Sequence, residues 1–125
     1  MSERTYLSLP INADEGFPQA FRLTFNGRTY QFLLYVNLPE AQLDEHEETI
    51  YELPQPGAFI VLRVVRETLD GPVTIFQRKL VPHLEYEAAE LALIFDTMRV
   101  ARLNLNGVGA FGSQLSGRIA ARWAS

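Results

Sequence analysis

The dipeptide Asn26-Gly27 constrains the fold of this chain more than any other feature. It separates two runs rich in aromatic and β-branched residues, 21–25 and 28–36. Asn-Gly is the favoured pair for a two-residue type I′ turn, because both central positions need a positive φ, and the flanking runs are typical of strands. A two-residue loop also fixes the register of an antiparallel hairpin. The pairs expected to lie opposite each other are Phe25 with Arg28, Leu23 with Tyr30, and Phe21 with Phe32.

Further strand patterns follow along the chain. The apolar, β-branched run 58–68 is followed by turn residues and by a return strand over 73–81, although Pro72 leaves the loop length open. Alternation of apolar and polar residues indicates strands over 101–105 and 115–123. The sequence therefore predicts a mainly β protein with one domain, residues 1–125, built as a small antiparallel β-barrel or sandwich of about six or seven strands.

The segment 84–98 allows two interpretations. Leu91, Ile94, Phe95 and Met98 have the spacing of one helix face, and the preceding glutamates and alanines favour a helix. Alternation within 91–95 fits a strand almost equally well. We expect a short helix within 85–98 by a narrow margin, and the strand stays open as the alternative.

The composition excludes several classes of protein. A chain of 125 residues suits a single domain with a real core, and the lack of cysteine removes disulfides, thiol nucleophiles and cysteine-ligated metals. No apolar run is long enough for a signal peptide or a membrane span. The formal net charge of −4 argues against a nucleic acid as the main partner.

The segment Gly107–Gly112 matches the pattern G-x-G-x-x-G. A dinucleotide-binding loop of that kind needs a helix directly after it and an acidic residue about 20 positions later. Only 13 residues follow Gly112, and no acidic residue follows Asp96. We interpret the segment as a turn or a place where another chain approaches the backbone closely. A stand-alone small-ligand or nucleotide-binding β-domain that uses this loop is kept as the alternative function.

Catalytic and metal-binding patterns are weak. His46 lies among acidic residues but lacks the spacing of a zinc or calcium motif. Glu85, Glu87 and Glu90 could form a carboxylate pair, yet such glutamates usually form a solvated face. No serine stands in a G-x-S-x-G motif. We expect no enzyme, no catalytic or metal site and no cofactor.

Charge is distributed unevenly along the chain. The long connection 37–57 has six acidic residues and no lysine or arginine, whereas 97–125 has four arginines and no acidic residue. Opposite patches on a small domain suit assembly with a partner, and pairing within the molecule is the open alternative. The residues expected to contact partners are Glu45, Glu47 and Glu48 in the acidic connection, Gly107, Gly109 and Phe111 in the glycine-rich loop, and Arg118, Arg122 and Trp123 near the C-terminus.

The N-terminal third resembles a family of small bacteriophage proteins, the baseplate plug proteins of contractile-tailed phages, including cyanophages. A short Leu7-Ser-Leu-Pro10 stretch precedes the family pattern Q-x-F-x-v-x-L-x-G-x-x-Y-x-l-x-v-x-x-N. The acidic connection 37–57 and the segment 103–112 depart from that pattern. The matching positions are Gln19, Phe21, Leu23, Phe25, Gly27, Tyr30, Phe32 or Leu34, and Asn37.

The resemblance implies a structural, non-catalytic component of a phage tail baseplate. Such a plug or hub-proximal protein would contact hub, tube or wedge proteins within a multi-subunit assembly. It would be synthesised in the host cytoplasm and would reside in the virion tail.

Overall fold

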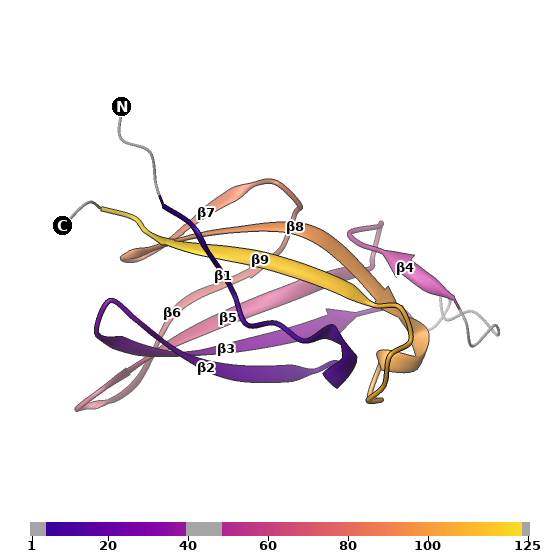
Figure 1. Ribbon diagram of the computed structural model, residues 1–125, viewed down its shortest axis with the longest axis horizontal. Coiled ribbons are helices and arrows are strands. Elements are labelled where there is room, and N and C mark those ends of the chain that lie inside the picture. Colours follow the sequence, from indigo (N-terminus) through magenta and orange to yellow (C-terminus); the bar gives the residue numbers. More distant parts are fainter. Residues whose placement is uncertain (1–4, 40–48, 124–125) are drawn as a thin grey trace.

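The computed structural model describes residues 5–39 and 49–123, and in these residues two antiparallel sheets pack face to face as a sandwich (Figure 1). One sheet has the strand order β2-β3-β5-β6. The other has the order β1-β9-β8, with β4 and β7 each paired to β8. The strands are β1 (Leu7–Ser8), β2 (Gln19–Phe25), β3 (Arg28–Asn37), β4 (Ile50–Glu52), β5 (Phe59–Thr68), β6 (Gly71–Lys79), β7 (Glu85–Ala88), β8 (Leu91–Ala101) and β9 (Gln114–Ala121).

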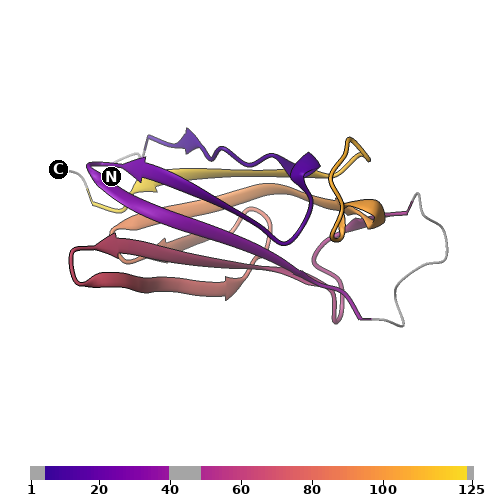
Figure 2. The same cartoon turned by 90° about the horizontal axis from the view of Figure 1, so that it is seen from below.

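The mainly β fold expected from the sequence is confirmed, as a sandwich and not as a closed barrel. In the part of the chain that the structure describes, two short 3₁₀ helices accompany the strands, η1 (Ala13–Glu15) and η3 (Arg102–Asn104). Figure 2 shows the two layers from the side. No helix in residues 5–39 and 49–123 has the length and apolar character of a membrane span.

The Asn26-Gly27 hairpin has the predicted register. Asn26 and Gly27 have φ values of 51° and 77°, as a type I′ turn requires. The strand pairs Phe25↔Arg28, Leu23↔Tyr30 and Phe21↔Phe32 all form between β2 and β3. The rings of Phe21 and Phe32 stack with their centroids 5.0 Å apart. The second hairpin, whose loop length the sequence left open, closes with Thr68 opposite Gly71.

The expected helix within 85–98 is wrong, because this segment forms the β7–β8 hairpin. A β-bulge between Phe95 and Thr97 inserts one extra residue into β8. The core residues of β8 therefore fall at 91, 93, 95, 98 and 100. Leu91, Phe95 and Met98 in that series match helical spacing, which explains the misleading pattern.

The predicted strand over 101–105 is also wrong beyond its first residue. Strand β8 ends at Ala101, and Arg102–Asn104 form the 3₁₀ helix η3. The side chain of Asn104 is fully buried, although its place in the alternating pattern suggested an outward-facing residue. The change at Ala101 starts an irregular segment that runs to Ser113 and builds one end of the sandwich.

The core lies between the two sheets. Tyr30, Phe32 and Leu34 of β3 are fully buried in the same cluster as Leu93 and Phe95 of β8. Such burial of large side chains from both sheets is the main source of stability for a sandwich. Different structural elements lie at the two ends of the sandwich. The turns of the β2–β3, β5–β6 and β7–β8 hairpins lie at one end (the hairpin end), and η1, η3 and β4 lie at the other (the loop end; Figure 1).

Candidate interaction site at the loop end

The glycine loop, residues 107–112, lies at the loop end between η3 and β9 (Figure 1). Strand β9 follows the loop, so no helix N-terminus faces it as a dinucleotide-binding loop would require. Gly109 and Gly112 have φ values of 154° and 101°, which L side chains rarely adopt. A Cβ atom at Gly109 would also lie 2.5 Å from Cζ of Phe111, so the phenyl ring packs directly on that glycine.

A buried polar network fixes the shape of the glycine loop. The side-chain amide of Asn104 donates hydrogen bonds to the carbonyl oxygens of Gly107 (3.2 Å) and Gly109 (3.1 Å). Its Oδ1 accepts a hydrogen bond of 2.6 Å from the hydroxyl of Ser113, whose oxygen in turn accepts from the Ala101 amide at 2.6 Å. The network satisfies buried polar groups on both sides of the loop and holds the loop in one conformation.

The segment around η1 is bound to the glycine loop from the other side. The Phe17 amide donates to the Asn104 carbonyl at 2.8 Å, and the Phe17 carbonyl accepts from the Asn106 amide at 2.7 Å. The Gly109 amide donates to the Asp14 carbonyl at 2.8 Å. At Gly16 a Cβ atom would lie 2.1 Å from the Gly107 oxygen, so only glycine permits this close approach. Segments about 90 residues apart in sequence thus form one rigid loop end.

Large apolar side chains are exposed on this loop end. Val108 and Phe111 belong to the glycine loop itself. The position of a Cβ at Gly112 lies 2.9 Å from Cδ1 of Ile50, and the position of a Cβ at Gly107 lies 2.2 Å from the carbonyl oxygen of Leu103. We call these four residues the apolar end patch. Its members and their exposed fractions are Ile50 (46%), Leu103 (37%), Val108 (78%) and Phe111 (39%).

A cavity of about 520 Å³ opens next to the apolar end patch. It is enclosed by three chain segments: the residues before β2, the end of β3 with the residues after it, and the segment from η3 to the glycine loop. Leu103 belongs to both the cavity and the patch. The lining residues are Phe17, Pro18, Val36, Leu38, Arg102, Leu103, Leu105, Asn106 and Gly107.

The predicted contact residues fall into three groups. Gly107, Gly109 and Phe111 come together at the loop end, as described. Glu45, Glu47 and Glu48 lie outside the described residues. Arg118, Arg122 and Trp123 lie on β9 or beyond it, away from the glycine loop.

Both of these arginines form ion pairs within the molecule. Arg118 makes two hydrogen bonds of 2.9 Å to Asp96, and Nη2 of Arg122 lies 2.7 Å from Glu87. The guanidinium of Arg122 also stacks 4.8 Å from the centroid of the exposed Trp123 ring. The two arginines are thus paired with carboxylates of the β7–β8 hairpin.

At the hairpin end of the sandwich, one carboxylate links the two sheets. Glu90, in the β7–β8 turn, accepts hydrogen bonds from Tyr30 and Arg66 and lies 3.1 Å from Nη1 of Arg28. Burial opposes ionisation of this carboxyl, but the hydrogen bonds from Arg66 and Tyr30 outweigh it and lower the pKa of Glu90 to about 2. Burial and the hydrogen bond to Glu90 raise the pKa of Tyr30 to about 12. The Glu90 carboxylate therefore stays ionised at neutral pH, where it pairs with Arg66 and Arg28.

The described side chains that could form a catalytic or metal site do not come together in the fold. In the described ranges, no three His, Asp or Glu side chains converge as a metal site would require. Nδ1 of His83 lies 3.7 Å from Asp96, which already pairs with Arg118. Glu85, Glu87 and Glu90 have different partners: Glu85 accepts from Tyr6, and Glu87 pairs with Arg122.

Comparisons with known proteins return no match, since no family model, curated protein or solved structure matches this chain.

The sequence analysis missed the residues that shape this site. Asn104 organises the glycine loop, and Arg102 with Leu105 lines the cavity. A detectable signal was the run Leu103-Asn-Leu-Asn-Gly107, since an asparagine two positions before a second Asn-Gly pair is typical of a loop and not of a strand interior.

Proposed function

We propose that the protein is a non-enzymatic structural component of a phage tail baseplate, a plug or hub-proximal protein that acts through protein–protein contacts. The apolar end patch is the observation that supports this proposal best. Exposed apolar side chains that gather at one place on a protein surface are typical of interaction sites. Here the exposed side chains lie on a loop end that hydrogen bonds hold rigid, so an interface there would require little ordering of the chain.

The assignment to a tail baseplate rests on the resemblance of segment 19–37. Its matching residues form the β2–β3 hairpin, with Phe21, Leu23 and Tyr30 turned toward the core and Gly27 in the turn. The hairpin therefore accounts structurally for the spacing of the matching residues, and the loop end would be the contact surface. The expected partners are hub, tube or wedge proteins of the tail.

The proposal is tested by affinity purification of the tagged protein from its native producing lysate, with mass spectrometry of the proteins that co-elute in stoichiometric amounts. We expect tail hub, tube or wedge proteins. In the variant Val108→Ser/Phe111→Ser their recovery should fall by about tenfold or more, because truncating central apolar contacts of an interface costs about 2 kcal/mol or more.

Leu69→Ser is the matched control for this experiment. Leu69 is a fully exposed apolar residue in the β5–β6 turn, far from the loop end (Figure 1). Its substitution should leave the recovery unchanged. Recovery of the wild-type protein alone, as a monomer, would contradict the proposal, as would equal losses for the Leu69 and the Val108/Phe111 variants.

The alternative, a small-ligand or nucleotide-binding domain that uses the glycine loop, has one observation in its favour: Gly107 lines the cavity. The cavity walls are mainly apolar, and β9 follows the loop where phosphate binding would favour a helix N-terminus. A thermal-shift screen with nucleotides and common metabolites tests this alternative. A ligand that raises the melting temperature of the wild type but not of Leu105→Ala would favour it.

A further inference from the structure

Among the described residues, Arg102 is the arginine that has a buried side-chain nitrogen without a hydrogen-bond partner. Its Nε is buried and has no hydrogen-bond partner, and within the described residues its guanidinium pairs with no carboxylate. By contrast, six other arginines lie within 3.8 Å of a carboxylate. They are Arg22, Arg28, Arg66, Arg99, Arg118 and Arg122, paired with Glu67, Glu90, Glu90, Glu52, Asp96 and Glu87.

An arginine left without a partner in a half-buried position is costly, since desolvation of a charged group is repaid only by a counter-charge or hydrogen bonds. The chain has a net charge of −4, and the two other arginines of the described residues that have no carboxylate partner there, Arg63 and Arg78, are exposed to solvent. The position of Arg102 at the wall of a cavity therefore points to an anionic group supplied from outside the described residues.

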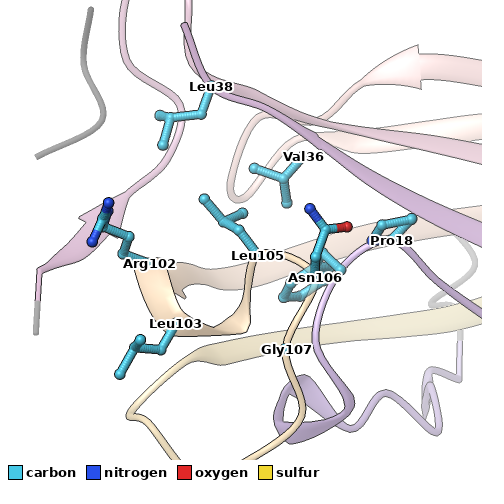
Figure 3. A pocket seen from close by; sticks show the side chains of 9 residues that line it. Pro18, Val36, Leu38, Arg102, Leu103, Leu105, Asn106 and Gly107 are labelled. Atoms are coloured by element: carbon cyan, nitrogen blue, oxygen red, sulfur yellow. The ribbon is translucent and has the colours of Figure 1, made fainter. Parts of the chain in front are cut away.

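The other residues that line the cavity indicate which kind of group would bind next to that anionic group. Figure 3 shows Val36, Leu38 and Leu105 pointing into a common space, with Arg102 on one side and Asn106 with Pro18 on the other. The apolar walls suit a large apolar side chain, and a volume of about 520 Å³ exceeds what one such side chain needs. The Asn106 amide can both donate to and accept from a peptide backbone.

We propose that this cavity is an anchor site for an acidic–apolar segment of a partner protein. A large apolar side chain of the segment enters between Val36, Leu38 and Leu105, and the carboxylate of an adjacent Asp or Glu pairs with the Arg102 guanidinium. The inference rests on the proposed function, because it names the chemistry of the partner at the same loop end. Leu103 joins the cavity to the apolar end patch, so both belong to one continuous surface.

A protein segment fits these observations better than a phosphate-bearing ligand. One guanidinium beside apolar walls matches one carboxylate, whereas nucleotides need several donors directed at their phosphates. The surface also continues beyond the cavity across exposed side chains, which a small molecule would leave uncovered. The partner segment would therefore place its anchor in the cavity and its flanks on the apolar end patch.

The test uses the full chain and capped tetrapeptides with the sequences Gly-Leu-Glu-Gly, Gly-Phe-Glu-Gly and Gly-Trp-Glu-Gly, each with a counterpart in which Gln replaces Glu. Binding is followed by the NMR shifts of the Leu103 and Leu105 methyl groups. We expect at least one acidic peptide to bind about tenfold more tightly than its Gln counterpart, as a charge-assisted pair with a half-buried arginine should provide.

Variants of Arg102 test whether this residue causes the tighter binding of the acidic peptides. In Arg102→Gln the acidic and amide peptides should bind equally. In Arg102→Glu the preference should pass to peptides with Lys in place of Glu. Arg99→Gln is the matched control, because Arg99 lies three residues earlier on the exposed face of β8, outside the cavity, and this variant should keep the wild-type preference.

Three results would overturn the inference: equal affinity of acidic and amide peptides for the wild type, shifts confined to residues outside the cavity, or a preference that Arg102→Gln and Arg102→Glu retain. These results are distinguishable from failure of the proposed function. Co-purified tail proteins with no peptide preference would overturn the anchor site alone. A preference that depends on Arg102, without co-purified tail proteins, would support the site and overturn the tail assignment.

Discussion

Asn104 shows how one buried polar side chain determines the shape of a surface loop. Its amide satisfies two carbonyl oxygens of the glycine loop, and its Oδ1 accepts from Ser113. A buried asparagine is stable only when its donors and acceptors are paired, as they are here. The rigid presentation of Val108 and Phe111 thus depends on a residue that never reaches the surface.

Asn104→Ala should lower the free energy of unfolding by about 2–3 kcal/mol, because the carbonyl oxygens of Gly107 and Gly109 lose their hydrogen bonds from the Asn104 amide and the Ser113 O–H loses its acceptor. Ser113→Ala should cost about 1 kcal/mol, since it removes fewer bonds. The measurement is urea denaturation of both variants and of the double variant. Because the two side chains share a hydrogen bond, the double variant should be less destabilised than the sum of the single variants. Strict additivity would show that the network is not coupled.

At the scale of single elements, sequence patterns located the long regular strands β2, β3, β5, β6 and β9, but not the short strands β1, β4 and β7. The β2–β3 hairpin could be predicted residue by residue because its turn needs positive φ values that Asn26 and Gly27 supply. Strand β8 could not, because its bulge after Phe95 displaces Met98 into helical phase with Leu91. A bulge is set by pairing with β9 across the sheet, and a local pattern does not contain that pairing.

Packing in the core explains why strand β9 has a glycine at position 117. Gly117 pairs with Phe95 of β8, and a Cβ atom there would lie 2.6 Å from Cε1 of that fully buried ring and 3.1 Å from Cδ1 of Leu9. Neither neighbour lies at a flexible surface position, so Gly117→Ala forces the core apart.

We expect Gly117→Ala to lower the free energy of unfolding by about 1–3 kcal/mol, the usual cost of overpacking a core. Thermal and urea denaturation measure the loss. Phe95→Leu in the same chain removes the atoms that the new methyl group meets, so the double variant should be more stable than the sum of the single effects predicts. Additive losses would mean that the ring is not the obstacle.

At the scale of the whole molecule, the layered architecture could be predicted from alternation and turn chemistry, whereas the candidate site could not. The cavity brings together Phe17, Val36 and Leu105, which the sequence separates widely and which only the packing of two sheets makes neighbours. The sequence also does not show which arginines are paired in the fold. Arg118 and Arg122 stand out in sequence but pair with Asp96 and Glu87 of the adjoining hairpin. Arg102, the arginine that lines the cavity, looks no different in sequence.

The ion cluster around Glu90 joins the two sheets at the hairpin end, since Glu90 lies between β7 and β8 while Tyr30 and Arg66 belong to β3 and β5. The pKa of Glu90 lies at about 2 in the folded protein, below its ordinary value of 4.5. A lowered pKa stabilises the fold above the ordinary value and loses that contribution as the pH falls toward the folded pKa.

The free energy of unfolding should therefore decrease between about pH 4.5 and pH 2, and Glu90, only 19% exposed, should account for about 2–3 kcal/mol of that decrease. Urea denaturation from pH 2 to pH 7 measures this decrease.

Glu90→Gln should be less stable than the wild type at pH 7, and its stability should approach that of the wild type near pH 2, because the wild-type carboxyl is then becoming neutral as well. Glu67→Gln removes an exposed pair with Arg22 and should leave the wild-type pH dependence almost unchanged, since exposed pairs contribute little. A constant difference between the wild type and Glu90→Gln across this range would show that the Glu90 charge does not hold the two sheets together.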